Sequence, residues 1–370
     1  MARHRPYART CPRSGSWRGQ RQHRAGRLQR HRRLGPVPPG AAPPAIRSKL
    51  SVKKIELHLH LEGAAPPEFI RALAREKRTD LAGVFDERGA YAYEDFAGFL
   101  RCYEAATSVL TTPRDHARLL AEVLERCAGE GVIYAELFVS PEFCGGGELS
   151  AWRDYAAAFN EVADQAREQG IDSRGIVTAI RHYGPDQAKR SALCAAETAG
   201  GWITGFGMGG AEQMHKATDF AWSFDCAREA GLGLTCHAGE WGGPASVREA
   251  LALGCTRIGH GVRAIEDRDL LRDLAQQNIT LEVCPGSNVA LGVCRAWDAH
   301  PIARLADAGV RVTVSTDDPP FFHTTLRHEY DRLASTFGWG DTEFRQINLW
   351  AAEAAFCDVA TRNRLKKEFA

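Results

Sequence analysis

The stretch GLTCHAGE, residues 233–240, decides how the rest of the chain is interpreted. Its apolar first half leads into two titratable residues, His237 and Glu240. A buried strand that carries chemical groups to the rim of a sheet has this pattern. His237 can be a metal ligand and Glu240 can carry a proton. Because a lone histidine at a strand end is more often a hydrogen-bonded structural residue, the interpretation requires that the pattern recur.

Strand-like and helix-like segments alternate along the chain from Val52 onward. We predict strands at residues 52–57, 132–139, 173–180, 202–206, 232–236, 257–259, 279–284 and 310–315. Nearly all are followed by helical segments, and this alternation predicts a parallel sheet. Eight repeats over about 310 residues fit the (β/α)8 TIM barrel of the α/β class. We also expect extra helices over residues 66–130, after the first strand, and at the C-terminus.

Titratable residues follow the predicted strands at the same end each time. In a TIM barrel this end carries the chemistry, so residues far apart in sequence are expected to meet on one rim. Structural histidines and aspartates that were independent of one another would have no reason to share this placement. The residues are His58, His60, His237, Glu240, His260, Asp317 and Asp318.

The first strand ends in a pair that suits a metal ion. His58 and His60 point to the same face of the strand because side chains alternate with a period of two. Three histidines and one aspartate suit Zn²⁺ and leave room for a water molecule. Zn²⁺ would lower the pKa of that water toward about 7. We expect one Zn²⁺ per subunit.

Three titratable residues of the rim then remain for catalysis: Glu240, His260 and Asp318. An acid–base step at an aromatic amidine needs this number of groups. One donates a proton to a ring nitrogen, one orients or deprotonates the water, and one fixes the ring. Strand four ends in GFGMGG, residues 205–210, without the lysine that bridges two metals in related barrels, which favours a single metal. The HxE and PCxxC pattern of cytidine-type deaminases is absent.

The composition is that of a globular protein, with 44% hydrophobic and 25% charged residues among 370. No apolar run reaches about 18 residues, so a membrane span is not expected. The eleven cysteines show no CxxC pair. Cys236 lies in a strand-like run, where cysteine packs as a small hydrophobic residue. These features favour a reducing, cytoplasmic location.

The first 48 residues differ from the rest. The first 50 hold 13 of the 47 Lys and Arg residues and no Asp or Glu, so the remainder has 34 basic against 46 acidic residues. We expect a disordered Arg- and Pro-rich leader over residues 1–48 and a single barrel domain over residues 49–370. The leader can be a nucleic-acid-binding arm, an organelle transit peptide or a non-functional extension.

Five ordered motifs resemble those of the adenosine deaminase family of the amidohydrolase superfamily, and the similarity extends over residues 52–366. They are HLHLEGA at 58–64, HAGE at 237–240, RIGHGV at 257–262, EVCPGSN at 282–288 and STDDPP at 315–320. The resemblance implies a mononuclear zinc enzyme that hydrolyses the amino group of a 6-aminopurine and releases ammonia. It also implies zinc ligands at His58, His60, His237 and Asp317.

The resemblance implies further roles at the rim. Glu240 matches the acid that protonates purine N1, His260 the base or electrostatic partner of the attacking hydroxide, and Asp318 the residue that holds N7. A dry pocket would raise the pKa of Glu240, as a proton donor requires. The substrate contacts implied are His60, Glu62, Phe99, Tyr103, Gly210 and Asp318, with Gly210 offering its backbone to N3. Core packing is an alternative for Phe99 and Tyr103.

The identity of the substrate is where the motifs disagree. Glu62 and Gly207 resemble the adenine deaminase branch, whereas GGAE at residues 209–212 is closer to the adenosine branch. We expect a purine nucleoside, adenosine or 2′-deoxyadenosine, converted to the inosine form in purine salvage. The alternatives are adenine, giving hypoxanthine, and a modified adenosine such as aminodeoxyfutalosine.

Two functions of other classes remain as alternatives. The basic leader could bind nucleic acid, with a steep salt dependence, but this leaves the residues at the strand ends unexplained. A barrel without activity is disfavoured because no member of the metal and proton-transfer set is missing. A dinucleotide loop at residues 205–210 lacks the G-x-G-x-x-G spacing. The sequence leaves the oligomeric state open.

Overall fold

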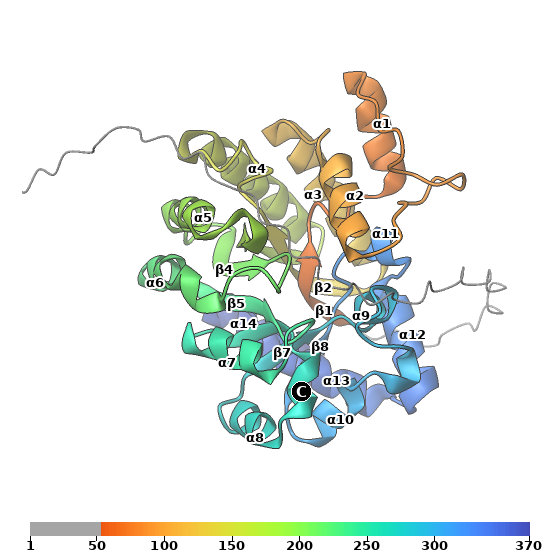
Figure 1. Cartoon of the computed structure of the whole chain (residues 1–370), viewed down its shortest axis with the longest axis vertical. Coiled ribbons are helices and arrows are strands. Elements are labelled where there is room, and N and C mark those ends of the chain that lie inside the picture. Colours follow the sequence, from red (N-terminus) through yellow and green to blue (C-terminus); the bar gives the residue numbers. More distant parts are fainter. Residues whose placement is uncertain (1–52) are drawn as a thin grey trace, which may run out of the picture. The chain divides into compact units, whose positions relative to one another are not determined.

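The computed structural model describes residues 53–370, which form a barrel of parallel strands surrounded by helices (Figure 1). The strand order is β1 through β8 in sequence, and every pairing is parallel. The predicted (β/α)8 fold is confirmed. The strands are β1 Lys54–His60, β2 Val132–Val139, β3 Asp172–Ile180, β4 Ile203–Gly209, β5 Gly233–Ala238, β6 Arg257–His260, β7 Thr280–Val283 and β8 Arg311–Val314.

The barrel closes between β8 and β1 through the backbone of Asp317. Its N–H donates to the carbonyl of His58 at 3.1 Å, and its carbonyl accepts from the N–H of His60 at 3.0 Å. The pairing of β4 with β5 is short, with register partners only at Gly205–Gly233 and Phe206–Leu234. The eight strands therefore form a barrel that is nearly closed, with its weakest pairings at β4–β5 and β8–β1.

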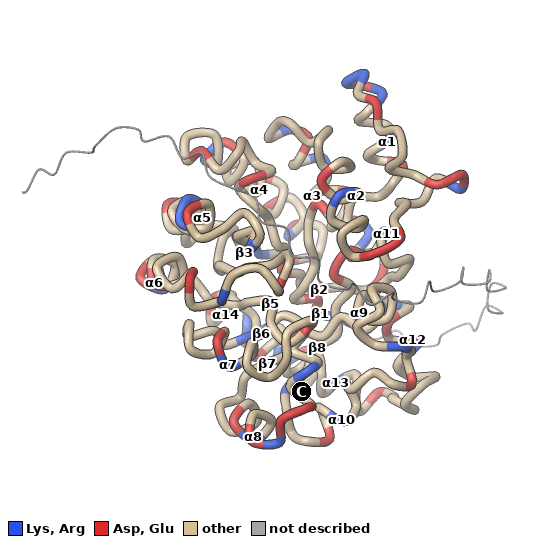
Figure 2. Tube along the Cα trace, viewed as in Figure 1, with Lys and Arg blue, Asp and Glu red and all other residues tan. Residues whose placement is uncertain are grey.

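Helices occupy the outside of the barrel, and Figure 2 shows charged residues of both signs along them in this view. The extra helices predicted after the first strand and at the C-terminus are present. The helices are α1 Pro67–Lys77, α2 Phe96–Thr107, α3 Pro113–Gly129, α4 Leu149–Glu168, α5 Pro185–Glu197, α6 Ala221–Glu229, α7 Pro244–Ala252, α8 Arg268–Gln276, α9 Pro285–Ala290, α10 Ile302–Asp307, α11 Pro319–Phe322, α12 Leu326–Phe337, α13 Asp341–Ala354 and α14 Val359–Phe369. Short 3-10 helices are η1 Arg181–Tyr183, η2 Ala217–Phe220, η3 Val262–Glu266 and η4 Trp297–Ala299.

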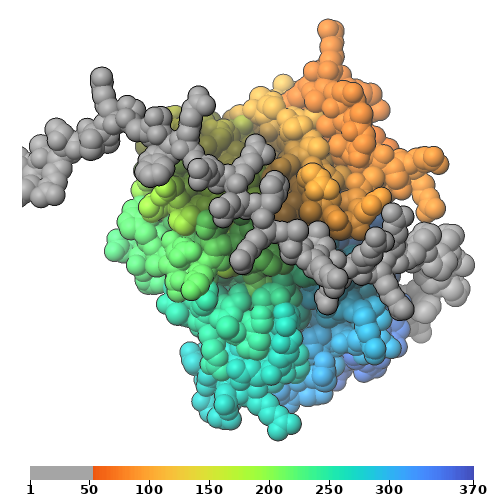
Figure 3. Space-filling model, viewed as in Figure 1, coloured from red at the N-terminus to blue at the C-terminus, as the bar shows by residue number. Residues whose placement is uncertain are grey.

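The helices expected within residues 66–130 are present as α1, α2 and α3. Between α1 and α2 the chain does not continue as a helix but forms turns and a bridge between Phe85 and Tyr91. Asp86 accepts hydrogen bonds from the backbone N–H groups of Arg88 and Ala90, which stabilises a turn instead of a helix. In the space-filling view, the orange segment that contains α1 and α2 projects from one side of the molecule (Figure 3).

The strand expected at residues 202–206 is longer, because β4 extends to Gly209. Glycine is a weak strand former, which hides this extension in the sequence. Close packing explains why glycine occurs in β4, since a Cβ at Gly205 would lie 2.8 Å from the ring of Phe356. A Cβ at Gly233 in β5 would lie 2.3 Å from the same ring. Phe356 follows α13 and fills the interior here.

The interior of the barrel also contains a charged network. The guanidinium of Arg257 lies 3.6 Å from the centre of the Phe356 ring. It donates to Glu282 at 2.6 Å and to Glu136 at 2.5 Å. All three charged side chains are at most 1% exposed. Removing one partner would leave a buried charge unpaired, at a cost of about 3–5 kcal/mol.

The predicted domain organisation, a leader followed by one barrel domain, is not tested by the structure. The predicted leader, residues 1–48, lies outside the described residues. The assignment of residues 49–370 to one domain stays a prediction. In the part of the chain that the structure describes, no helix has the length and apolar character to cross a membrane.

Candidate active site

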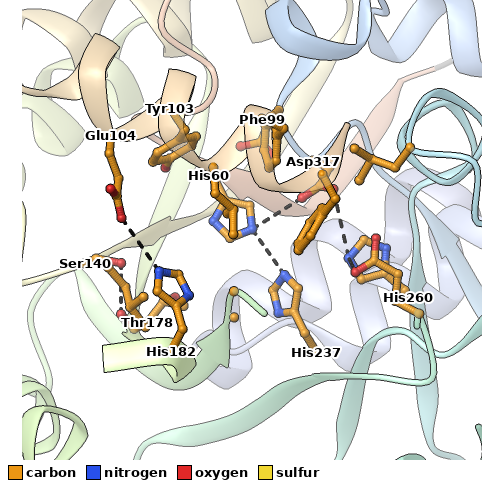
Figure 4. Close-up of a pocket in the computed structure, with 18 of the residues that line it drawn as sticks. His60, Phe99, Tyr103, Glu104, Ser140, Thr178, His182, His237, His260 and Asp317 are labelled. Carbon is orange, nitrogen blue, oxygen red and sulfur yellow. Dashed lines mark hydrogen bonds and ion pairs between the residues drawn. The ribbon is translucent and has the colours of Figure 1, made fainter. Parts of the chain in front are cut away.

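A cavity of about 90 Å³ opens at the C-terminal ends of the strands. Figure 4 shows His60, His237, His260 and Asp317 gathered on one side of it, with Phe99 and Tyr103 above. We call the strand-end residues the metal wall: His60, His237, Glu240, His260, Asp317 and Asp318. We call the α2 residues the helical wall: Phe96, Phe99, Leu100, Tyr103 and Glu104.

The four predicted zinc ligands converge. The Nε2 atom of His237 lies 3.1 Å from Nε2 of His58 and 3.2 Å from Nε2 of His60. The Oδ1 atom of Asp317 lies 3.4 and 3.3 Å from the same two nitrogens. A tetrahedral zinc site with Zn–N bonds of about 2.0–2.1 Å separates its ligand atoms by about 3.3 Å. The residues present therefore fit one zinc ion.

His58 is oriented by a carboxylate behind it. Its Nδ1 lies 2.8 Å from Oε2 of Glu282, and both side chains are fully buried. Burial opposes protonation, but hydrogen bonds that His58 donates to the carboxylates of Asp317 and Glu282 outweigh it and raise the pKa of His58 to about 9. Metal-binding histidines are commonly held in this way by a carboxylate, which fixes the ring and raises its basicity. Glu282 lies within the EVCPGSN motif, but its local sequence does not indicate this role.

Two residues of the metal wall have strained backbones. His260 has φ 59° and Asp317 has φ 65°, in the left-handed region that side chains other than glycine rarely adopt. Asp317 is held there by its bonds to β1 and by Ser287, whose hydroxyl donates to Oδ2 at 2.6 Å. Strained residues of this kind cluster at functional sites, where the surroundings hold them.

Glu240 lies in the same cavity and is 5% exposed. Burial, followed by the charges of Asp317 and Glu212, raises its pKa well above the usual range of a carboxyl group. A raised pKa keeps the group protonated near neutral pH, so Glu240 can donate a proton. Its Oε2 lies 3.9 Å from Nε2 of His260.

The loop that carries Glu240 is held by a second glutamate that sequence reasoning missed. The carboxylate of Glu212 accepts from the backbone N–H groups of Gly239 at 2.7 Å, Trp241 at 2.7 Å and Gly242 at 2.8 Å. It also accepts from the N–H of Glu240 at 3.2 Å. Glu212 therefore fixes residues 239–242. The position of Glu212 in the GGAE motif after β4 was its only signal.

Asp318 is buried beside the metal site. Its Oδ1 has no hydrogen-bond partner among the described residues. Burial, then the charges of Asp317 and Glu240, raises its pKa well above the usual range. Gly63 makes room for it, since a Cβ there would lie 1.6 Å from Oδ1. A protonated Asp318 can donate a hydrogen bond to a ring nitrogen.

The predicted substrate contacts line the cavity at every position except Glu62, with His60 and Asp318 already named in the metal wall. Phe99, Tyr103 and Gly210 line it. Gly210 has φ 96°, and a Cβ there would lie 2.8 Å from Nδ1 of His182. Glu62 does not line this cavity; it is 2% exposed, with its carboxylate 3.8 Å from His116. Burial raises the pKa of Glu62 to about 8.

Several residues of the cavity were not predicted, among them Glu104 and His182 at the side away from His260 (Figure 4). Glu104 accepts a hydrogen bond of 2.8 Å from the hydroxyl of Tyr183 and lies 3.7 Å from Nε2 of His182. No motif marks these residues, because they lie on a helix surface and a short connection. The other unpredicted lining residues include Phe96, Leu100, Phe143 and Leu291.

Comparisons with known proteins agree with this geometry. The model of the adenosine deaminase family matches residues 53–370. Adenine deaminase of Rhizobium leguminosarum bv. trifolii is 49% identical over 319 residues, which are 85% of this chain and 98% of that protein. The crystal structure of adenine deaminase from Arthrobacter aurescens has a TM-score of 0.78 and 29% identity, and the match covers 86% of this chain and 98% of that one.

A second solved structure contains a metal. It is an amidohydrolase from Burkholderia ambifaria with bound Zn, with a TM-score of 0.77 and 26% identity, and the match covers 86% of this chain and 90% of that one. The family match and the described candidate metal site make this chain an enzyme, a deaminase-type hydrolase that acts on C–N bonds. The chain belongs to the adenosine deaminase family of the amidohydrolase superfamily.

Proposed function

We propose that this protein hydrolyses the 6-amino group of adenine, giving hypoxanthine and ammonia. The observation that carries this proposal is the 49% identity, over nearly the whole length, to a protein named adenine deaminase. The cavity supplies the groups that the reaction needs: four candidate metal ligands and two carboxyl groups with raised pKa values.

The expectation of adenosine or 2′-deoxyadenosine as the substrate is not supported by the comparisons, which favour the alternative, adenine. The GGAE motif at residues 209–212 pointed to the adenosine branch, which these comparisons do not favour. Gly207, which pointed to adenine, has a packing reason of its own. A Cβ there would lie 3.1 Å from Cγ2 of Thr235.

We propose that His58, His60, His237 and Asp317 hold one Zn²⁺, in agreement with their spacing. When bound, the ion would act as a Lewis acid and bring the pKa of a water molecule near neutrality. In the proposed reaction, a bond forms between the water oxygen and C6 of the purine. The amino group leaves as ammonia, so that adenine and water become hypoxanthine and ammonia.

The protein groups act on the ring nitrogens in this proposal. Glu240 donates its proton to N1, which makes C6 more electrophilic. Asp318, protonated, donates a hydrogen bond to N7, and the backbone N–H at Gly210 faces N3. His260 faces the attacking oxygen. The aromatic side chains of the helical wall contact the face of the purine ring and exclude water. Exclusion of water strengthens the electrostatic interactions within the site.

A purine base is the small-molecule partner in this proposal, and salvage of purines is the metabolic role. We also propose a cytoplasmic location, supported by the ten cysteines of the described residues, all of which are free. A nucleic-acid partner is not proposed.

The test is ammonia release by the purified, zinc-loaded protein from adenine, adenosine and 2′-deoxyadenosine, assayed side by side. We expect activity on adenine, at least 100-fold above that on the nucleosides in kcat/KM, on the order of the 10²–10⁵ that pocket contacts can discriminate. A preference for a nucleoside would overturn the choice of substrate. Inactivity on all three with zinc bound would overturn deamination of these purines.

A further inference from the structure

A chain of hydrogen bonds runs from the backbone at α10 to the ring of His260. The N–H of Ile302 donates to Nδ1 of His300 at 3.2 Å. Nε2 of His300 lies 3.2 Å from Oδ1 of Asn288. Nδ2 of Asn288 lies 3.2 Å from Nδ1 of His260. The three side chains are at most 2% exposed, so water does not compete for these bonds.

The donors and acceptors in this series of hydrogen bonds can be arranged in one way only. A backbone N–H is always a donor, so Nδ1 of His300 must accept and carries no proton. The proton of a neutral His300 is then on Nε2 and donates to Oδ1 of Asn288. The amide group of Asn288 consequently turns its NH2 toward His260, whose Nδ1 must accept.

The opposite orientation of the Asn288 amide is excluded by the same reasoning. It would require Nε2 of His300 to accept while Nδ1 accepts from Ile302, but a neutral imidazole has only one acceptor nitrogen. Nor can His300 be an imidazolium, because its Nδ1 would then present a proton to the N–H of Ile302. Burial agrees, since it lowers the pKa of His300 to about 3.

The other side of the His260 ring faces the cavity. Its Nε2 lies 3.9 Å from Oε2 of Glu240 and 4.0 Å from Oδ2 of Asp317. In the arrangement set by Asn288, the proton on Nε2 therefore points toward the groups of the cavity. The backbone of Asn288 is also fixed, since its N–H donates to Cys284 at 3.0 Å and its carbonyl accepts from Cys294 at 2.8 Å.

We propose that Asn288 and His300 are positioning residues that hold His260 as the neutral tautomer with its proton on Nε2. His260 then faces the reacting atoms as a hydrogen-bond donor and not as the general base. The tautomer follows from the hydrogen bonds alone, whereas its catalytic consequence rests on the proposed function. Neither Asn288 nor His300 lines the cavity.

The direct test is nitrogen NMR of the native, zinc-loaded protein with ¹⁵N-labelled histidine rings. His260→Gln identifies the two signals of His260 by their loss. We expect a protonated Nε2 and an unprotonated Nδ1 at neutral pH. A proton on Nδ1, alone or together with Nε2, would overturn the proposal. This measurement needs no activity, so it stays decisive even if adenine is not the substrate.

Steady-state kinetics test the catalytic consequence of the His260 tautomer. Asn288→Asp replaces the NH2 that faces His260 by an acceptor of the same shape, which draws a proton to Nδ1. We expect kcat to fall by about 10²-fold or more, as with wrong tautomers of catalytic histidines, with KM and zinc content nearly unchanged. An unchanged kcat would contradict the positioning role.

His300 offers a matched pair of variants. In His300→Gln the amide nitrogen can replace Nε2 as donor to Asn288, so kcat should stay close to the wild-type value. In His300→Phe the donor is absent, Asn288 is free to turn over, and kcat should fall by at least about 10-fold. A merely structural role predicts that melting temperature and kcat fall together in both variants, and equal kcat values for the two would contradict the relay.

Discussion

The two walls of the cavity are built in different ways. The metal wall comes from strand ends, and its residues are almost entirely buried, with Asp317 and Asp318 each 4% exposed and His260 1% exposed. The helical wall comes from one exposed helix, and the side chain of Glu104 is 46% exposed. The helical wall also has a buried part, because Phe99 is 6% exposed and its ring centre lies 5.4 Å from that of Phe321 in α11.

Buried carboxylates explain the rigidity of the metal wall. Glu212 holds the loop of Glu240, and Glu282 holds His58. Glu329 accepts from the N–H of Gly286 at 2.9 Å and so fixes the segment that contains Ser287. Glu56 accepts from the N–H of Thr316 at 2.9 Å, next to Asp317. The helical wall is supported differently: behind it, the buried carboxyl group of Glu62 forms a hydrogen bond with the side chain of Tyr103. The difference suggests that the metal wall determines the reaction and the helical wall the substrate.

Removing a ligand should give the largest effect. His237→Ala deletes the nitrogen that lies within 3.2 Å of the other two imidazoles. We expect loss of bound zinc and a fall in kcat of about 10³-fold or more, since a metal supplies several kcal/mol. Elemental analysis and ammonia release measure the two effects. Full zinc content would remove His237 from the ligand set.

Glu240→Gln keeps the shape of the metal wall but removes the proton. We expect zinc to remain and kcat to fall by about 10²–10⁴-fold. Because the raised pKa of Glu240 means that the protonated form is active, wild-type activity should fall as the pH rises through that pKa. The variant should lose this dependence. A pH–rate profile of both proteins measures it, and near-normal turnover by the variant would contradict the role of proton donor.

Glu212→Gln tests whether the anchoring carboxylate matters. A glutamine nitrogen would face backbone N–H groups that now have an acceptor, at a cost of about 1–3 kcal/mol. We expect kcat to fall by about 10- to 100-fold with zinc retained. Glu249→Gln is the matched control, because Glu249 also accepts from a backbone N–H, that of Ala217 at 3.1 Å, but Ala217 lies outside the loop of residues 239–242. Equal effects of the two variants would show that the anchor is not specific.

Glu104→Gln should have the smallest effect on adenine. The side chain is half exposed, so its charge contributes little to binding a neutral base. We expect kcat and zinc content to stay within about two-fold. If the helical wall determines the substrate, the kcat/KM ratio of AMP to adenine should rise, because repulsion of the phosphate is removed. An unchanged ratio would assign discrimination to other residues.

The contrast between the walls also explains what the sequence could predict. His58, His237, His260 and Asp317 were predictable because each ends a strand of a regular βα repeat, and a parallel barrel brings such ends together. The helical wall was predictable only at Phe99 and Tyr103, through the family resemblance. Aromatic residues at helical spacing look the same in a core as in a pocket.

The anchoring residues were missed for a different reason. Glu212 and Glu282 bind backbone groups or side chains from distant segments, and local sequence carries no record of such partners. The helix α9 was missed because it spans only residues 285–290. A run that short shows no period of its own. The substrate was misjudged because Glu62 and Gly207 pointed to one branch of the family and the GGAE motif at residues 209–212 to the other.

The position of Phe356 has a consequence for how the protein is made. Its ring packs against the glycines of β4 and β5 and contacts Arg257, yet it follows all eight strands in the sequence. During synthesis the strands leave the ribosome well before this residue. Until it arrives, the charged network inside the barrel lacks its cover. Deleting residues 356–369, which contain Phe356 and α14, should therefore reduce the yield of folded protein.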